Sequence, residues 1–266
     1  MTPEIPAPSS SQRSGLSKRQ FLAGAVAGAC TLQSGRWAAA AMQKPEENSY
    51  DPPEAVSYAQ AGEDLIVAFI FNHLGVSPTY IDIGAYDPVR INNTYLFYTR
   101  GYRGVLVEPN PDLTARLQGM RPRDTVLAVG IGVTNEKEVD YYRCTEPSWN
   151  TFDKATAESY GTATKGRVTI KEVTRVPLVK ITDVFAKHFG GAAPDFFSID
   201  VEGFEVPILK TMDFEKQRPK AVCVETLVAG TNKQKLEAVE FLIDKGYAVR
   251  GSTFANTILI DKKILG

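Results

Sequence analysis

The sequence predicts an α/β domain with a mainly parallel central sheet and helices on both faces. First, short apolar runs alternate with helical segments from about Ser57 onward, which implies repeated βαβ units. Second, the apolar runs lack a period of two, as expected for strands that are covered on both faces. Third, 43% hydrophobic and 23% charged residues are ordinary values for a soluble globular protein. A length of 266 residues suffices for one well-buried domain with appendages.

The first half of the domain begins with a helix over residues 65–74, where apolar residues recur at helical spacing. Glu63 and Asp64 would lie in its first turn, where the helix dipole favours acids. A short helix over 93–100 follows the first strand, with Asn92 or Asn93 as its N-cap. The expected strands here cover residues 79–83, 104–108 and 125–129, with another helix over 111–117.

The second half begins with extended segments over 138–143 and 167–179, which flank a polar insertion. The clearest amphipathic helix runs from Lys233 to Lys245 and ends at Gly246. The remaining expected helices cover 182–189 and 206–212, and the remaining strands cover 195–200, 221–225, 247–250 and 257–260.

The N-terminal region differs from the rest and divides the chain into three parts. Residues 1–42 form a segment that is either signal-like or disordered, 43–56 a Pro-rich linker, and 57–266 the folded domain. A charged stretch, a short apolar run and small residues in succession are typical of a secretory signal. The apolar run is too short for a transmembrane helix.

The residues Ser17–Leu22 resemble the bacterial twin-arginine export motif, with Lys18 in place of the first arginine. A working signal would place the protein in the periplasm or outside the cell. The alternative is a disordered tail with an Ala-rich helix, and the protein would then be cytoplasmic.

The composition excludes several classes of function. A net charge of -1 gives no indication of a nucleic-acid partner. Cys30, Cys144 and Cys223 lack the spacing of a zinc site, and we expect no disulfide framework. His73 and His188 each fall near the end of an expected helix, where a cation is favourable, so we expect no histidine-driven mechanism.

Acids stand at four expected strand ends, where open α/β sheets bind their ligands. These acids are Asp82, Glu108, Asp200 with Glu202, and Glu225. The next glycine after Gly84 is Gly101, so the glycine fingerprint of a nicotinamide or flavin dinucleotide site is absent. This absence makes a nicotinamide oxidoreductase a weaker hypothesis for the function.

An acid-rich pocket without this fingerprint favours S-adenosylmethionine, which carries a sulfonium cation and no phosphate. Gly84 would allow a close backbone approach, and Glu108 would accept hydrogen bonds from the ribose hydroxyls. Asp82 would orient the turn or meet the ammonium group. The predicted cofactor-binding residues are Asp82, Gly84, Ala85, Tyr86, Glu108, Asn110 and Gly130.

Several motifs together resemble the FkbM-type methyltransferase family. The main one is Phe197–Glu205, FSIDVEGFE. The others are YAQAGED at 58–64, YIDIGA at 80–85, NNTY at 92–95, GYRG at 101–104, VEPN at 107–110, ITD at 181–183 and VET at 224–226. The resemblance implies a Rossmann-like class I methyltransferase fold and O-methylation of a hydroxyl on a sugar or natural product. The expected partner is therefore a small-molecule or carbohydrate acceptor.

We predict Asp200 as the base that removes the hydroxyl proton, with Glu202 as the second candidate. Alternatively, these acids bind the methionyl end of the cofactor or cap the next helix. Our predicted site contains no metal, although Asp200, Glu202 and Glu225 could supply oxygen ligands for a divalent metal such as Mg²⁺. The aromatic residues of the insertion are expected either to stack on a sugar ring or to form a satellite core; they are Tyr141, Tyr142, Trp149 and Phe152.

The export-like N-terminus motivates a competing class of function. S-adenosylmethionine is made in the cytoplasm, so an exported domain would lack its methyl donor. The alternative is an exported, non-catalytic module that holds a glycan or a protein partner on a methyltransferase-like fold.

Overall fold

The computed structural model describes residues 56–228 and 231–265. The expected export signal, most of the expected linker, and Cys30 lie outside the described residues. The described residues belong to one compact unit. None of its helices is long and apolar enough to cross a membrane.

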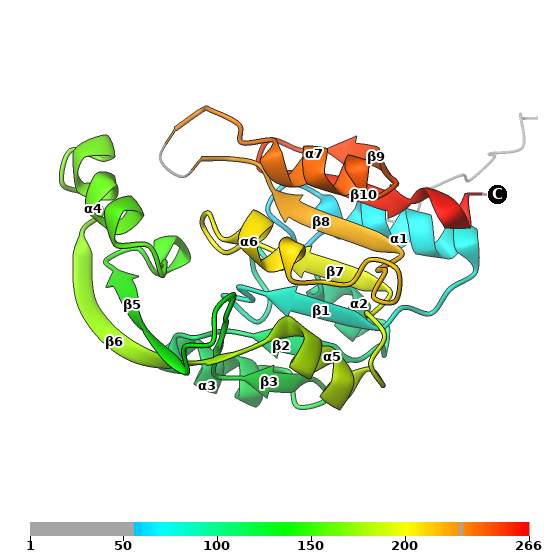
Figure 1. The fold of residues 1–266 in the computed structure, drawn as a ribbon, viewed down its shortest axis with the longest axis horizontal. Helices are drawn as coiled ribbons and strands as arrows, with labels where there is room; N and C mark the ends of the chain where they lie inside the picture. Colours follow the sequence, from blue (N-terminus) through cyan, green and yellow to red (C-terminus); the bar gives the residue numbers. More distant parts are fainter. Residues whose placement is uncertain (1–55, 229–230, 266) are drawn as a thin grey trace, which may run out of the picture. The chain divides into compact units, whose positions relative to one another are not determined.

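A seven-stranded sheet forms the centre of the fold. Its strands are β1 (Tyr80–Ile83), β2 (Gly104–Val107), β3 (Thr125–Leu127), β7 (Phe196–Ile199), β8 (Ala221–Glu225), β9 (Tyr247–Ser252) and β10 (Asn256–Asp261). The order across the sheet is β3-β2-β1-β7-β8-β10-β9 (Figure 1). The first five strands in this order are parallel, whereas β10 is antiparallel to both neighbours. The carboxyl ends of the five parallel strands therefore meet at one edge, and the connection order reverses between β1 and β7.

Helices cover both faces of this sheet, as the sequence predicted. One face carries α1 (Glu63–Leu74), α2 (Tyr95–Thr99) and α3 (Pro111–Met120); the other carries α5 (Ile181–His188), α6 (Glu205–Lys210) and α7 (Glu237–Asp244). Successive residues of β1 point to opposite faces. Tyr80 joins the core beneath α1 and α2, whereas Ile81 and Ile83 join the core beneath α5 to α7. His73 and His188 lie in the last turns of their helices, as predicted.

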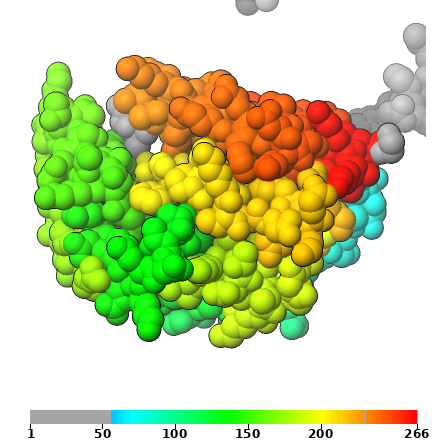
Figure 2. All heavy atoms as spheres, viewed as in Figure 1, coloured from blue at the N-terminus to red at the C-terminus, as the bar shows by residue number. Residues whose placement is uncertain are grey.

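The insertion between β3 and α5 forms a second, three-stranded sheet. Its elements are β4 (Gly130–Ile131), β5 (Glu138–Cys144), the 3-10 turn η1 (Pro147–Trp149), α4 (Lys154–Ala163) and β6 (Ile170–Val179). Outside the insertion, the 3-10 turn η2 (Lys262–Ile264) follows β10. β6 lies between β4 and β5, parallel to the first and antiparallel to the second. Figure 2 shows this insertion as the green lobe at one end of the described unit.

The structure corrects three details of the sequence prediction. The polar insertion contains α4, which Asp153 caps by accepting a hydrogen bond from the Thr156 N–H. The expected helix over residues 233–245 covers only Glu237–Asp244. Its first residues instead lie beside the end of β8, where the Lys235 N–H donates to the Thr226 carbonyl. The N-cap of α2 is Thr94 rather than Asn92 or Asn93.

Candidate functional site

A cleft opens at the carboxyl ends of the parallel strands, between the main sheet and the insertion. The ends of β1, β2 and β7 form its floor, and residues of η1, of β5 and of the segment after η1 cover it. The cleft encloses about 710 Å³ outside the protein atoms, part of which is open to solvent.

Gly84 is required where β1 ends. Its φ of +83° belongs to the left-handed region, and an added Cβ would lie 1.9 Å from the backbone carbonyl oxygen of Asp200. Gly84 therefore allows the ends of β1 and β7 to approach each other closely. It also lines the cleft. The Gly84 N–H donates to the carbonyl of Val107 at 3.0 Å, which joins this turn to β2.

Glu108 is a buried carboxylate at the end of β2, and it lines the same cleft. One carboxylate oxygen accepts from the Tyr86 N–H at 3.0 Å and the other from the Asn110 N–H at 2.8 Å. Burial raises the pKa of Glu108 to about 7, although both hydrogen bonds act in the opposite direction. Each carboxylate oxygen can still accept a second hydrogen bond, so a ligand diol could pair with both.

Asp82 is buried on the opposite face of β1 and does not line the cleft. It accepts from the Thr94 hydroxyl at 2.9 Å. The same hydroxyl accepts from Arg121, which is fully buried. Burial raises the pKa of Asp82, and the Arg121 guanidinium partly offsets this. The alternation along β1 turns this side chain toward α2, a direction that the D-x-G motif does not reveal.

The other predicted cofactor-binding residues divide into two groups. Tyr86 and Gly130 line the cleft, whereas Ala85 and Asn110 do not. The Ala85 carbonyl accepts from the Asn92 side chain. Asn110 caps α3 through its side chain and donates its backbone N–H to Glu108. Ala85 and Asn110 therefore shape the walls rather than face the cavity.

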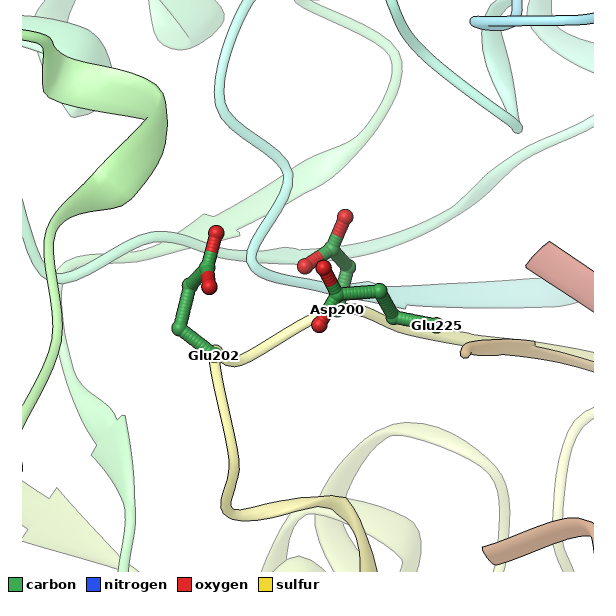
Figure 3. A group of neighbouring side chains, drawn as sticks. All are labelled: Asp200, Glu202 and Glu225. Atoms are coloured by element: carbon green, nitrogen blue, oxygen red, sulfur yellow. The ribbon is translucent and has the colours of Figure 1, made fainter. Parts of the chain in front are cut away.

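Three carboxyl groups, which we call the acid cluster, gather where β7 and β8 end. They belong to Asp200, Glu202 and Glu225, and one oxygen from each lies within 4.8 Å of the others. Figure 3 shows the three side chains turned toward a common space. Asp200 and Glu202 also line the cleft. The sequence analysis placed these acids at neighbouring strand ends, and the structure brings them together.

Crowding of these acids in a buried place alters their protonation. Burial, Glu225 and Glu202 raise the pKa of Asp200 well above its usual range. Burial and Glu225 raise the pKa of Glu202 to about 8. Burial raises the pKa of Glu225 to about 7, although Lys235 opposes this shift. These carboxyl groups can therefore take up protons near neutral pH.

The turn after β7 holds Glu202 in an unusual conformation. Glu202 has a φ of +53°, which is rare for a residue other than glycine, and Gly203 follows with a φ of +108°. The buried Glu205 carboxylate accepts from the backbone N–H groups of Val201 and Gly203. The Tyr160 hydroxyl of α4 donates to the Glu202 carboxylate at 3.2 Å. The insertion thus contacts the acid cluster directly.

Lys235 contacts the acid cluster at Glu225. Its ammonium group lies 2.7 Å from the Glu225 carboxylate and 3.2 Å from that of Glu205. Hard divalent cations prefer carboxylate oxygens, so the cluster has suitable donors for such an ion. Because Lys235 already neutralises part of the charge on Glu225, Asp200 and Glu202 are the acids more open to a ligand.

The aromatic residues of the insertion serve two different roles. Tyr141 and Phe152 line the cleft, with their ring centroids 4.8 Å apart. Trp149 packs instead against Tyr160 at 4.9 Å, beside a satellite core. Tyr142 lines a separate groove. Trp149 therefore joins the satellite core, and stacking on a sugar ring stays a prediction for Tyr141 and Phe152.

Sequence reasoning missed three polar lining residues, Ser148, Asn150 and Thr151. They flank Trp149 in a segment that carries no recognised motif. The nearby aromatic residues were the only signal that this part of the insertion could face a ligand.

The cleft's charge suits a cation. Its lining contains Glu108, Asp200 and Glu202 but no Lys, Arg or His among the described residues. A phosphate-bearing dinucleotide would meet repulsion here. A sulfonium cofactor would meet attraction, and its ribose could reach the acceptor oxygens of Glu108. The residues present therefore fit S-adenosylmethionine.

Comparisons with solved structures give several similar α/β proteins. One is a TehB-like SAM-dependent methyltransferase from Corynebacterium glutamicum, with 10% identity, a TM-score of 0.39, and coverage of 76% of this chain and 89% of that chain. Another is an O-methyltransferase from Bacillus cereus in complex with SAH, with 10% identity, a TM-score of 0.38, and coverage of 79% and 84%. A third is the magnesium protoporphyrin IX methyltransferase from Synechocystis with bound SAM, with 9% identity, a TM-score of 0.38, and coverage of 76% and 80%. No curated protein sequence matches the chain.

The sequence itself matches the model of the methyltransferase FkbM domain over residues 82–249. This range contains the strand ends that carry Glu108, the acid cluster and the whole insertion. The sheet order, with one antiparallel strand inserted beside β8, is that of a Rossmann-like class I methyltransferase. The chain therefore belongs to the FkbM methyltransferase family, and its chemistry is S-adenosylmethionine-dependent methyl transfer.

Proposed function

We propose that this protein is an O-methyltransferase that acts on a hydroxyl group of a sugar or natural product. The observation that carries the proposal is the buried Glu108 carboxylate, which two backbone N–H groups hold in a cleft that no basic side chain of the described residues lines. Glu108 would accept hydrogen bonds from the ribose hydroxyls. The turn from Gly84 to Tyr86 would approach the methionyl part, and Gly130 would lie near the nucleobase.

The remaining predicted cofactor-binding residues would hold the backbone around the site in place. Asp82 would hold the start of α2 through Thr94, and so orient the turn after β1. Asn110 would fix the Glu108 carboxylate, and the Ala85 carbonyl would anchor the turn on Asn92.

S-adenosylmethionine supplies the methyl group when bound, and the acids at the end of β7 would handle the acceptor's proton. Asp200 lines the cleft and has no side-chain hydrogen-bond partner among the described residues, so it is the first candidate for the base. In its ionised form it would take the proton of the acceptor hydroxyl. A raised pKa makes a carboxylate a stronger base near neutral pH. Glu202, the second acid that follows β7, would receive the proton of the acceptor hydroxyl or relay it.

The test is a calorimetric titration of the full chain with S-adenosylmethionine and S-adenosylhomocysteine. We expect saturable binding that Glu108→Gln weakens by about ten- to a hundredfold, because an amide cannot accept through both atoms. Glu158→Gln, which changes an exposed acid of α4, is the matched control and should bind as the native protein does.

Acceptor screening with sugars and hydroxylated natural products would follow, with mass spectrometry of the products. A methyl ether would support the O-methyltransferase proposal. Methylation on nitrogen or carbon would contradict it, and a folded chain that binds neither cofactor would leave the non-catalytic binding module as the better hypothesis.

A further inference from the structure

A second groove adjoins the cleft, where the segment between β1 and α2 meets the insertion. It shares the lining residues Tyr86, Ile91 and Ser148 with the cleft. The insertion lines the rest of it and contributes three further side chains that bear on its chemistry: Glu146, Trp149 and Arg167. We call this the Trp149 groove. A molecule bound there would lie beside the cofactor cleft without occupying it.

Both walls of the Trp149 groove lead to the acids at the end of β7. On one wall, Tyr86 belongs to the turn whose glycine leaves no room for a Cβ beside the backbone carbonyl of Asp200. On the other wall, Trp149 packs on the ring of Tyr160, and the hydroxyl of Tyr160 donates to Glu202. A molecule in this groove can therefore extend a group into the cleft toward both candidate bases.

The separate groove that contains Tyr142 is less suited to the acceptor. It shares only Phe152 with the cleft. Phe152 lies against Gly130, since a Cβ added there would come within 2.5 Å of its ring. Gly130 follows β3, and β1 and β2 separate β3 from β7 in the sheet. This groove therefore meets the cleft far from the acids, whereas the Trp149 groove meets it beside them.

Two residues of the Trp149 groove have backbone conformations that are rare without glycine. Tyr86 has a φ of +52° and Ile91 a φ of +54°. The conformation is especially unfavourable for Ile91, because its side chain is β-branched. Ile91 is also 54% exposed. Strained residues gather where the backbone shapes a ligand site, so the exposed apolar surface of Ile91 indicates contact with an apolar part of a ligand.

Arg167 brings a positive charge to the groove without a counter-ion. Its Nε donates to the Thr164 carbonyl at 3.2 Å, which holds the side chain beside the end of α4. Its two terminal nitrogens have no hydrogen-bond or ion-pair partner among residues 56–228 and 231–265. The Glu146 carboxylate accepts instead from the Ser148 hydroxyl at 3.1 Å. A guanidinium with both terminal nitrogens available suits a planar anion, which it can hold through two parallel hydrogen bonds.

The charges of the groove favour a singly charged anion. Glu146 lines the same groove as Arg167. A doubly charged phosphate would be repelled by Glu146 more strongly than a carboxylate would. The Glu146 carboxylate can also accept hydrogen bonds from hydroxyl groups. The pair therefore suits a molecule that carries one carboxylate and several hydroxyls.

We propose that the Trp149 groove binds an acceptor sugar that carries a carboxylate, with this carboxylate on Arg167. Trp149, which is half-buried against the satellite core, and Ile91 offer apolar surface to the C–H face of the ring. Glu146 accepts from the ring hydroxyls, and one further hydroxyl enters the cleft beside Asp200. This inference rests on the proposed function, and it narrows the acceptor to a sugar acid.

The test measures the binding of methyl glycosides to the full chain saturated with S-adenosylhomocysteine, by ligand-observed NMR. The probes are matched pairs of a uronic acid and its parent hexose in the gluco, galacto and manno series. We expect the acid of at least one pair to bind about tenfold more tightly than its neutral partner, because only the acid forms charge-assisted hydrogen bonds with Arg167.

The variant Arg167→Gln assigns this preference to one side chain. It should abolish the preference for the acid and leave the affinity for the hexose unchanged. Arg103→Gln is the matched control, because it removes the same charge from an exposed arginine directly before β2, at the edge of the sheet opposite the cleft. This control should keep the preference. Both variants should bind S-adenosylhomocysteine as the native protein does.

The variant Trp149→Leu tests the position of the sugar ring. It should weaken both members of the preferred pair by about three- to tenfold and preserve the preference for the acid. Its affinity for S-adenosylhomocysteine should not change, and thermal unfolding of the unliganded variant distinguishes a lost contact from a misfolded chain. Unchanged glycoside affinity in Trp149→Leu would place the ring elsewhere and overturn the inference.

Three other results would overturn the inference while the proposed function stands. The first is equal or undetectable binding of the two members of every pair. The second is a preference for the acid that persists in Arg167→Gln. The third is tighter binding of the corresponding hexose 6-phosphates than of the uronic acids, which would assign the groove to a phosphate. A native chain that binds no S-adenosylhomocysteine would refute the proposed function itself.

Discussion

Two groups of charged residues contact the same sheet, and they differ in charge balance: one is buried beneath its helices and the other lies at the carboxyl ends of its strands. The first, which we call the Arg121 cluster, contains Arg121, Asp124, Tyr80, Asn92 and Thr94. The Arg121 and Asp124 side chains are both 0% exposed, and their charged atoms lie 2.7 Å apart. The second is the acid cluster, in which Glu225 alone pairs with an ammonium group of the described residues, that of Lys235.

The difference separates a structural role from a chemical one. The Arg121 cluster satisfies its donors and acceptors internally and does not line the cleft. It ties the end of α3 to the segment before α2 and to β1. The acid cluster has more negative charge than its surroundings compensate, and two of its members face the cleft. Uncompensated charge of this kind destabilises the fold but prepares groups for proton transfer or cation binding.

The largest effect on stability is expected from Arg121→Met. Removal of the guanidinium leaves Asp124 buried without its partner, which should reduce the free energy of unfolding by about 3–5 kcal/mol. Urea denaturation measures the loss. Arg116→Met is the matched control, because its ion pair with Asp87 involves an arginine side chain that is 56% exposed. It should cost less than about 1 kcal/mol. Similar losses for the two variants would show that the buried pair of Arg121 and Asp124 stabilises the fold no more than the exposed pair does.

A smaller effect is expected from pH acting on the acid cluster. The pKa values of about 8 for Glu202 and about 7 for Glu225 exceed the ordinary 4.5 of a glutamate. The folded state therefore retains protons that the unfolded chain releases between pH 4.5 and pH 8. Stability should fall as pH rises through this window, by about 1–3 kcal/mol between pH 5.5 and pH 8.5.

The variant Glu202→Gln identifies the source of this pH dependence. A neutral side chain at this position should flatten the decline in the free energy of unfolding, measured by urea denaturation at several pH values. Glu158→Gln should leave the slope unchanged, since this acid is exposed on α4. A native protein whose stability rises from pH 5.5 to pH 8.5 would contradict the charge imbalance.

The smallest effect is expected from Tyr160→Phe, which removes the hydroxyl that donates to Glu202. Loss of this hydrogen bond should reduce the free energy of unfolding by about 0.5–1.5 kcal/mol. It should also raise the pKa of Glu202, so the decline in stability should extend to higher pH. Tyr142→Phe removes a hydroxyl elsewhere on the insertion and is the control. An unchanged pH profile in Tyr160→Phe would show that α4 does not act on the acid cluster.

Much of the fold follows from local patterns in the sequence. The apolar strands, the helical periodicity and the position of Glu108 directly after a strand all predicted elements that the structure contains. The strand-end argument also placed Asp200, Glu202 and Glu225 at one edge. This argument succeeds because parallel strands necessarily bring their carboxyl ends together. The family match over residues 82–249 agrees with the resemblance that these motifs carried.

Other features depend on contacts between distant segments. Asp82 lies on the face of β1 away from the cleft, where it accepts from the Thr94 hydroxyl, which in turn accepts from Arg121. The final long helix is shortened because Lys235 pairs with Glu225 and with the Thr226 carbonyl. No local pattern distinguishes these outcomes from the ones that we predicted.

The sequence by itself determined the class of fold, the order of its elements and the acids that stand at the strand ends. Hydrophobic periodicity and turn residues act over a few positions, and they suffice for these features. The tertiary structure alone decided which side chains face the cleft and where the insertion packs. Such features arise from the packing of segments that are far apart in the chain, and the burial that results sets both hydrogen-bond needs and pKa values.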